Sequence, residues 1–177
     1  MTRLILLTIL ILAGSFTAQA QDTPKAELFG GYAYAGSGSN WFVTSIVGNV
    51  NDWFGVGAEI SGQYTRLNDA GITEKINNNS FLFGPQFSSR KNKAVTPFVH
   101  AKFGVSRIHT DTNEFGPLVS FSDKSFGMAL GGGLDIRLND TVAIRAFQID
   151  YLRTHFFNQT QNKGRIAVGL VLRFGKK

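Results

Sequence analysis

Few residues in this chain have the types and spacing of a catalytic site. His109 and Asp111 stand two positions apart, and an imidazole beside a carboxylate is a common pair for proton transfer. Both lie in a polar stretch that is predicted to be a loop, so they are interpreted as solvated surface groups. None of the three histidines begins a His-x-Ser motif, and neither a G-x-S-x-G sequence nor a metal-binding spacing occurs. The sequence therefore predicts a protein that is not an enzyme and that binds no cofactor or metal.

A larger set of polar residues alternates with apolar ones, which is the pattern of β-strands. Residues 126–138 read F-G-M-A-L-G-G-G-L-D-I-R-L, in which every second residue is apolar except Gly132. Because successive side chains of a strand point to opposite faces, one face is apolar and the other carries Asp135 and Arg137. The run exceeds the roughly 9–11 residues that a tilted transmembrane strand needs.

Similar alternation predicts eight strands, at residues 26–35, 41–50, 53–66, 80–89, 95–107, 126–138, 141–154 and 164–174. Short turns follow the second, fourth and sixth strands. Longer polar loops follow the others, at residues 36–40, 67–79, 108–125 and 155–163. This arrangement predicts an all-β fold, an eight-stranded antiparallel up-and-down transmembrane β-barrel. A soluble barrel of lipocalin type is the alternative, but an interior lined by the charged residues would not suit an apolar ligand.

Side chains of the polar face are predicted to line the interior of the barrel. They are Glu59, Gln86, His100, Lys102, Asp135, Arg137, Arg145, Gln148, Asp150, Arg165 and Arg173. An eight-stranded barrel leaves room only for side chains, and these carry both charges, so ion pairs are predicted to fill the interior and close it to solutes. Glu59, Asp135 and Asp150 are each expected beside an interior Arg or Lys. Asp135→Ala is expected to destabilise the protein more than any loop substitution.

Residues 141–154 contain a break in the alternation. Arg145 must face the interior and Phe147 must face lipid, although the two residues have the same parity in the sequence. One residue must therefore be absorbed, and a β-bulge is predicted at about Ala146.

Aromatic and cationic residues lie near the ends of the predicted strands, as in the girdles at membrane interfaces. The aromatic residues at the short-turn end are Trp53, Phe54, Phe87, Phe98 and Phe174, and those at the loop end are Tyr34, Trp41, Tyr64, Phe81, Phe126 and Tyr151. The cations at or near the loop end are Arg66, Lys75, Arg107, Lys124, Arg153 and Lys163. These cations could bind lipid phosphates through charge-assisted contacts, and the alternative is that they are scattered solvated charges.

Residues 1–20 read as a secretory signal peptide, with a basic start, an apolar run and an A-x-A end at Ala18-Gln19-Ala20. An anchor helix is the alternative, but the apolar run is too short to span a membrane comfortably. Cleavage before Gln21 would leave residues 21–177 as one barrel domain. The chain has no cysteine, so an exported fold would contain no disulfide. The formal net charge is +6, and export favours anionic lipid headgroups over nucleic acid as the partner of that charge.

Short motifs along the chain occur in an order that is typical of one family of membrane proteins. They are E-L-F-G-G-Y at 27–32, G-N-V-N-D-W-F-G-V at 48–56, S-F-L-F-G-P at 80–85, T-P-F-V-H at 96–100, M-A-L-G-G-G-L-D at 128–135, I-R-A-F-Q-I-D-Y at 144–151 and the closing R-F-G. Across residues 21–177 the chain resembles the small outer-membrane β-barrel proteins of Gram-negative-type bacteria, of the OmpA-like and opacity-protein-like kind. One departure is that Phe174 is followed by Gly175-Lys176-Lys177, whereas these barrels often end on an aromatic residue.

The resemblance implies an outer-membrane location, insertion by the barrel-assembly machinery, and contact with outer-membrane lipid and lipopolysaccharide. We expect a monomer without nucleic-acid partners. The implied role is non-enzymatic, in envelope structure or in surface contact through the external loops. A small porin-like channel for solutes is the alternative. An outer-membrane lipid-modifying enzyme is less favoured, because the His-x-Ser pair of the barrel deacylases is absent.

Overall fold

The computed structural model describes residues 23–35, 40–69, 72–112, 119–156 and 159–176. The predicted signal peptide and its cleavage site before Gln21 lie outside these residues. No helix in the described part of the chain is long and apolar enough to cross a membrane.

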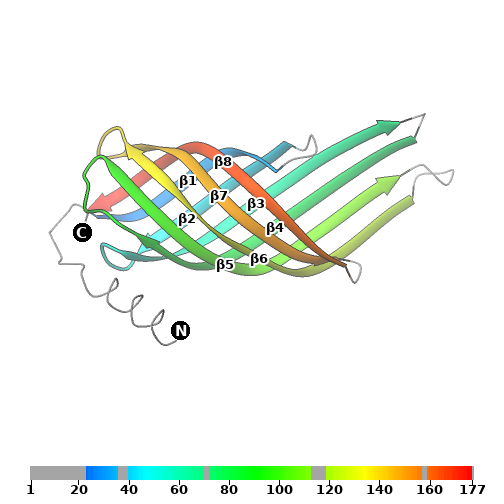
Figure 1. The fold of residues 1–177 in the computed structure, drawn as a ribbon, viewed down its shortest axis with the longest axis horizontal. Helices are drawn as coiled ribbons and strands as arrows, with labels where there is room; N and C mark the ends of the chain where they lie inside the picture. The colour runs from blue at the N-terminus through cyan, green and yellow to red at the C-terminus, as the bar shows by residue number, and fades with distance from the viewer. Residues whose placement is uncertain (1–22, 36–39, 70–71, 113–118, 157–158, 177) are drawn as a thin grey trace, which may run out of the picture.

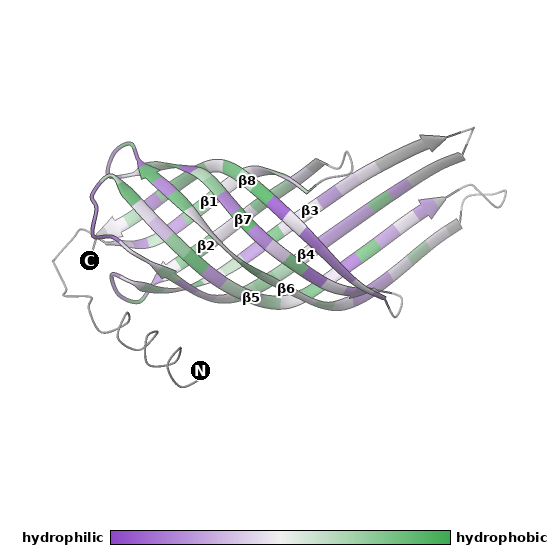
Figure 2. Ribbon diagram, in the orientation of Figure 1, coloured by the Kyte–Doolittle hydropathy of each residue, from purple (hydrophilic) through white to green (hydrophobic). Residues whose placement is uncertain are grey.

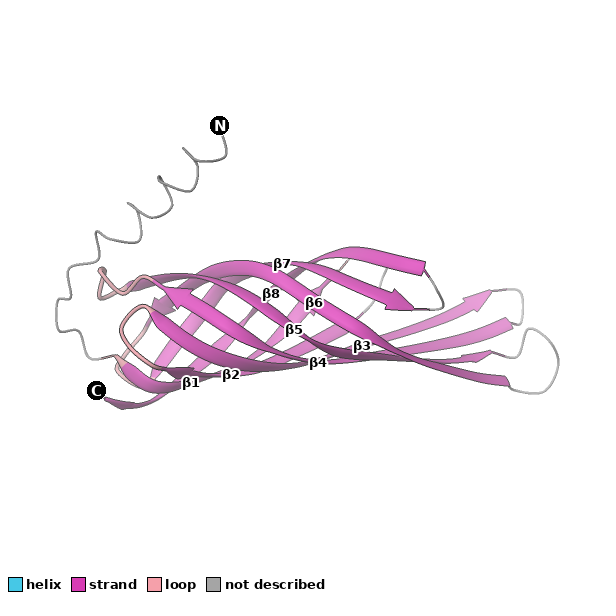
Figure 3. Ribbon diagram, turned by 90° about the horizontal axis from the view of Figure 1, so that it is seen from below, coloured by secondary structure: helices cyan, strands magenta, loops and turns pink. Residues whose placement is uncertain are grey.

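The chain forms eight antiparallel strands that close into a barrel (Figure 1). Each strand pairs with its neighbours in the sequence, and β8 pairs with β1 to close the sheet. The strands are β1 (Pro24–Tyr34), β2 (Asn40–Asn49), β3 (Phe54–Asp69), β4 (Ile72–Ser88), β5 (Val95–Thr112), β6 (Val119–Arg137), β7 (Val142–Phe156) and β8 (Gln159–Lys176). The predicted eight-stranded antiparallel up-and-down barrel is confirmed. Figure 3 shows the described turns together at the end of the barrel where the C-terminus lies, which we call the short-turn end.

Apolar side chains cover the outside of the barrel, and polar side chains fill its inside. Ile46, Val99 and Leu170 are 53%, 59% and 54% exposed, whereas Lys102 and Arg165 are fully buried. Figure 2 shows the resulting alternation of hydrophilic and hydrophobic residues along the strands. Monomeric soluble proteins rarely expose apolar patches of more than a few hundred Å². The outer surface of this barrel is therefore suited to contact with lipid.

Several strands are longer than the sequence pattern predicted, and the additional residues lie at the end opposite the short turns. The loops predicted at residues 67–79, 108–125 and 155–163 are largely strand, because β4, β6 and β8 begin earlier than expected. These loop predictions were wrong because polar residues prevail on both faces of the sheet there. The hydrophobic alternation then no longer marks a strand, although the backbone ladder continues.

Four strands continue beyond the rest of the barrel as an open sheet, on the right in Figure 1. β3 pairs with β4 as far as Asp69, whereas β2 pairs with β3 only as far as Tyr64. β4 and β5 stay paired to Thr112, and β5 pairs with β6 as far as Val119. The pairing of β7 with β6 ends at Gly127. We call residues 65–69, 72–79, 107–112 and 119–126 the projecting sheet, and the end of the barrel that carries it the projecting end.

The predicted bulge in β7 is confirmed. Leu134 of β6 pairs with Phe147 and the next residue, Asp135, pairs with Arg145, so Ala146 is left over. The pairing of β7 with β8 shifts at the same place. As a result Arg145 is buried inside the barrel while Phe147 is 42% exposed on the outside. The extra residue restores the correct facing for the rest of the strand.

The aromatic girdles contain fewer residues than predicted. At the short-turn end the rings of Trp53, Phe54 and Phe87 gather on the outside, with centroids 5.4–5.9 Å apart. Trp41 and Phe98 were predicted in the girdles, but both are only 4% exposed and lie inside the barrel. Both predictions were wrong because nearness to a strand end was used in place of parity. Trp41, for example, shares its face with the buried Val43 and Ser45.

Inward-facing glycines make room for a third interior ring, that of Phe29. A Cβ on Gly31 would lie 2.6 Å from Phe29 Cζ, and one on Gly169 would lie 2.9 Å from Phe29 Cε2. Phe29 is 1% exposed and belongs to a small apolar cluster with Val43 and other interior residues. The interior therefore combines apolar packing with the charged groups described next.

Candidate functional site

Charged side chains from four strands meet in the middle of the barrel. The Nζ atom of Lys102 lies 2.8 Å from Glu59 Oε2. The guanidinium of Arg165 donates hydrogen bonds to Asp150, with Nε 2.9 Å from Oδ2, and also contacts Glu59. His100 Nε2 lies 3.0 Å from Asp150 Oδ1, close enough for an ion pair but not aligned for a hydrogen bond. We call these five residues the central ion-pair layer.

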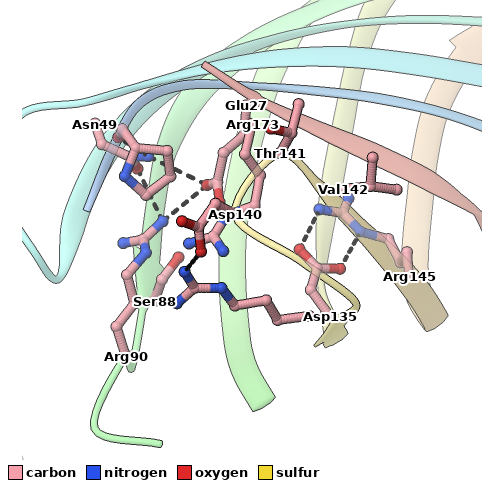
Figure 4. A network of polar contacts seen from close by, with 12 residues as sticks. Glu27, Asn49, Ser88, Arg90, Asp135, Asp140, Thr141, Val142, Arg145 and Arg173 are labelled. Carbon is pink, nitrogen blue, oxygen red and sulfur yellow. Dashed lines mark hydrogen bonds and ion pairs between the residues drawn. The ribbon is translucent and has the colours of Figure 1, made fainter. Parts of the chain in front are cut away.

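Gln148 joins the central layer to a second cluster around Arg145. Gln148 Nε2 donates to Asp150 Oδ2 at 2.8 Å, and Arg145 Nη1 donates to Gln148 Oε1 at 2.6 Å. Arg145 also forms a bidentate pair with Asp135, at 2.8 and 3.0 Å (Figure 4). Bidentate arginine–carboxylate pairs are among the strongest charge-assisted contacts. This pair lies beside the β-bulge, so the bulge positions Arg145 for the interior network.

Two aromatic rings hold the Arg145 guanidinium in place. Its Cζ atom lies 4.2 Å from the centroid of the Phe29 ring and 4.1 Å from that of the Phe98 ring. Cation–π contacts of this kind contribute more when they are shielded from water, as they are here. Phe29 and Phe98, which face inward, therefore help to stabilise this buried guanidinium.

A third cluster closes the short-turn end of the barrel (Figure 4). Arg90 follows the end of β4 and turns back into the interior, where it is 6% exposed. Its Nη2 atom donates to Glu27 Oε2 at 2.8 Å and to Asn49 Oδ1 at 3.2 Å, and its Nη1 atom donates to the Asp52 carbonyl at 2.8 Å. Arg173 Nε lies 3.5 Å from Glu27 Oε1. Arg90 thus ties two turns and the first strand together.

The structure places the predicted interior residues on the inner face of the barrel. All are buried or nearly so except Arg137, whose side chain is 25% exposed at the short-turn rim, where it pairs with Asp140. The predicted interior set omitted Glu27, Asn49 and Arg90, although the alternation of the first two strands places Glu27 and Asn49 on the inward face. Their parity is the signal that identifies them, since each shares a face with other inward residues. Arg90 carries no such signal, because it lies in a turn.

The ion pairs meet across the interior of the barrel, so we expect no steady, large conductance from the purified protein in planar lipid bilayers. The eight-stranded barrel has an interior just wide enough for side chains, and here Arg165, Lys102 and Glu59 meet across it. Single-channel recordings test this expectation, with heat-unfolded protein as the control for leakage. A stable open level from the folded wild-type protein would contradict it.

His109, Asp111 and Ser120 lie together without the geometry of a serine–histidine–aspartate triad. His109 and Asp111 lie on strand β5 in the projecting sheet, not in a loop as predicted, and their side chains are 42% and 22% exposed. His109 Nε2 is 3.2 Å from Asp111 Oδ1, and the Ser120 hydroxyl donates to the same oxygen at 2.5 Å. The hydroxyl therefore contacts the carboxylate and not the imidazole that would have to activate it. The described residues contain no group of three His, Cys, Asp or Glu that could hold a metal ion.

The predicted lipid-contacting cations do not all face outward. Arg107 and Lys124 are exposed and lie directly opposite each other on β5 and β6. Each lies two positions from an exposed apolar residue, Val105 or Phe126, on the side of the projecting end, and so just beyond the apolar band. Lys75 and Arg153 are also exposed, and the side chain of Arg66 lies outside the described residues. Lys163 was predicted among these contacts, but its parity with the buried Arg165 turns it into the barrel, where it lines a cavity.

Comparisons with known proteins agree with this architecture. The family model described as outer membrane protein beta-barrel domain matches residues 6–174. A search of curated proteins found no match.

Similar solved structures include Ail, the attachment invasion locus protein of Yersinia pestis, with a TM-score of 0.63 and 18% identity over 86% of this chain and 99% of that chain. Neisserial surface protein A is similar with a TM-score of 0.57 and 14% identity, over 84% of this chain and 96% of that chain. The N-terminal barrel domain of Pseudomonas aeruginosa OprF has a TM-score of 0.50 and 10% identity, over 87% and 100%. At these identities the likeness shows the fold alone. Because the family model covers nearly the whole chain, the protein belongs to the outer membrane protein β-barrel domain family.

Proposed function

We propose that this protein is a non-enzymatic surface-contact protein of the outer membrane, exported by a signal peptide cleaved after Ala20 and inserted as a monomer by the barrel-assembly machinery. In outer-membrane barrels the short turns face the periplasm and the longer connections face outward. The projecting sheet then stands outside the cell. This sheet is the observation that carries the proposal. A barrel that only spanned the membrane would not need strands that extend beyond it.

The composition of the projecting sheet supports a contact role. Its outer face carries the exposed Lys75, Asn79, Arg107 and Lys124, which can bind acidic or polar partners. Its two edges, on β3 and β6, extend past the described pairing with β2 and β7. Ail is called an attachment invasion locus protein, and it has also been crystallised with the heparin analogue sucrose octasulfate, a polyanion. By analogy, the basic outer face of this sheet suits a polyanionic surface.

Shortening the projecting sheet tests the proposal. Residues 65–76 and 107–124 are each replaced by Asn-Gly, which removes Lys75, Arg107 and Lys124 and joins paired strand positions through a turn suited to a hairpin. Bacteria that display this variant are expected to adhere to heparin-coated surfaces several-fold less than bacteria that display the wild type. The control is a matched shortening of the β7–β8 hairpin at residues 155–160. Unchanged adhesion of the first variant, or equal loss in both, would contradict the proposed role.

We infer in addition that Arg107 and Lys124 bind phosphate groups of outer-leaflet lipopolysaccharide. Two like charges directly opposite each other on neighbouring strands destabilise a sheet unless an anion lies between them. Their place just beyond the apolar band is the level of the lipid headgroups. Charge-assisted hydrogen bonds to phosphate would remove the repulsion.

The double variant Arg107→Gln, Lys124→Gln is expected to lose about 2 kcal/mol of the stabilisation that lipopolysaccharide provides, the scale of one or two hydrogen bonds to charged groups. The measurement is thermal unfolding in vesicles with and without lipopolysaccharide. Lys91→Gln, Lys93→Gln, at the short-turn end, is the matched control and should retain the whole effect. An equal response of both variants to lipopolysaccharide would favour solvated charges.

A further inference from the structure

The charges inside the barrel are balanced at its centre but not at its short-turn end. In the central ion-pair layer one lysine and one arginine contact two carboxylates. The next cluster holds one charge of each sign, Arg145 and Asp135. At the short-turn end two buried arginines, Arg90 and Arg173, share the carboxylate of Glu27. A buried charge without a matching counter-charge is costly, so this end of the barrel favours a further anion.

Arg173 is the less well satisfied of these two arginines. The Nη2 atom of Arg90 donates hydrogen bonds both to Glu27 Oε2 and to Asn49 Oδ1. Arg173 Nε lies 3.5 Å from Glu27 Oε1, which is close enough for an ion pair but long for a hydrogen bond. The Arg173 side chain is 7% exposed and makes no other ion pair or hydrogen bond with a described residue. Its terminal nitrogens therefore keep donors for a ligand at the mouth of the barrel.

Arg137 brings another guanidinium to the same mouth. Its Nε atom donates to the Asn139 carbonyl at 3.3 Å, and the backbone N–H of Arg173 donates to the Thr141 carbonyl at 2.7 Å. Both arginines thus contact the turn between β6 and β7, and both have the parity of the inward face. Arg137 pairs with Asp140 at the rim, where its side chain is 25% exposed. Figure 4 labels Arg173, Thr141 and Asp140 in this region.

The other charged groups at the short-turn end leave the mouth positive. Apart from the pair of Arg145 with Asp135, the described side chains there include six cations and three carboxylates, which are Lys25, Arg90, Lys91, Lys93, Arg137, Arg173, Glu27, Asp52 and Asp140. Asp52 accepts a hydrogen bond from the Thr23 hydroxyl at 2.7 Å. An excess of positive charge around an opening attracts anions and repels metal ions.

We propose that the short-turn mouth of the barrel binds a phosphate group, which Arg173 and Arg137 hold through their guanidinium groups. A guanidinium presents a planar fork of donors that matches the oxygens of phosphate. Phosphate suits two arginines from different strands better than a carboxylate does, because it carries more acceptor oxygens and up to two negative charges. The group could belong to a free phosphate compound or to the headgroup of a phospholipid in the nearer leaflet.

Nuclear magnetic resonance of the isotope-labelled, folded protein tests the proposal. The protein is held in a maltoside detergent, which carries neither phosphate nor charge, and is titrated with inorganic phosphate. The backbone amide resonances of Thr141 and Arg173 are expected to shift saturably at millimolar phosphate. Sodium chloride of the same ionic strength should leave them in place. The amide of Gly164, in the other half of the barrel, is the internal control and should not shift.

Arg173→Gln is expected to weaken phosphate binding about tenfold, the scale of one hydrogen bond to a charged group. Arg137→Gln repeats the test at the exposed rim without altering the buried contacts of Glu27. Lys93→Gln removes the same charge from the turn between β4 and β5 and should bind phosphate like the wild type. Altered gel mobility without heating verifies that each variant is folded.

The proposal is overturned if phosphate produces no saturable shift or if chloride produces the same shift. It is also overturned if Lys93→Gln weakens binding as much as the two arginine variants do, because the site would then be a diffuse positive surface.

A second titration in bilayers of phosphatidylglycerol separates the two sources of the phosphate group. If the lipid is the ligand, the amides of Thr141 and Arg173 already have the positions that phosphate produces in detergent, and added phosphate has no further effect. If a free phosphate compound is the ligand, added phosphate shifts these amides in the bilayer as it does in detergent. Either result supports the proposal, which is independent of the adhesion proposed for the projecting sheet.

Discussion

Deletion of Ala146 is expected to leave the barrel folded, whereas deletion of Ala129 is expected to prevent folding. Ala146 is the extra residue of the bulge in β7. Without it, Arg145 and Phe147 become adjacent and keep their present partners in β6, so every later side chain stays on its face. The free energy of unfolding should change by about 1 kcal/mol, the central value for single substitutions.

Ala129 is the matched control because it is the same residue type in a strand without a bulge at that point. Its deletion makes the outward Met128 and Leu130 adjacent, so one half of β6 must turn over. If the second half turns, Asp135 leaves Arg145 and faces hydrocarbon, which membranes tolerate poorly.

The two deletion variants are compared after refolding into lipid vesicles, by mobility on gels with and without heating. A heat-modifiable band is expected for the variant without Ala146 and not for the one without Ala129. Loss of that band in both variants would contradict this prediction, because the barrel would then need Ala146 for more than the correct facing of the side chains in β7.

Glu59→Ala is expected to destabilise the barrel by about 3–5 kcal/mol, the cost of breaking a buried ion pair by removing one partner. Glu59 is 1% exposed and contacts both Lys102 and Arg165. Its removal leaves the buried cations Lys102 and Arg165 without the carboxylate that both contact. The sequence alone singled out Asp135 for this effect. That prediction compared Asp135 only with loop residues, and the structure favours a larger effect at Glu59, because Asp135 pairs with Arg145, which also contacts two aromatic rings.

The measurement is urea unfolding of the vesicle-inserted protein, followed by tryptophan fluorescence. Asp111→Ala is the control: it also removes a paired carboxylate, but one on the exposed projecting sheet, where ion pairs contribute about 0–1 kcal/mol. Glu59→Gln keeps the shape of the side chain and should fall between the two. Similar midpoints for Glu59→Ala and Asp111→Ala would contradict a stabilising role for the central ion-pair layer.

The length of the strands shows where sequence reasoning stops. Within the apolar band, as at residues 126–138, alternation marked each strand and its faces. Beyond the band both faces of the sheet are mostly polar, and residues 72–79 read as a loop although they are part of β4. The backbone hydrogen bonds that extend these strands depend on the neighbouring strand, which the local sequence does not reveal.

The sequence by itself determined the fold class, the facing of most side chains and the bulge at Ala146. Each of these follows from a two-residue period that is local to one strand. The same period gives no information about residues in turns, which is why the sequence did not predict Arg90 inside the barrel.

Only the tertiary structure decided which charges meet and which space stays open. Glu59 and Arg165 are 106 positions apart, and they touch because the strands close with a particular tilt and stagger. The same closure brings Phe29 and Phe98 into contact with Arg145. It also turns Lys163 toward Trp41 and Asn78 in the cavity. Parity tells which residues face inward, but the neighbours they find there depend on the geometry of the closed barrel.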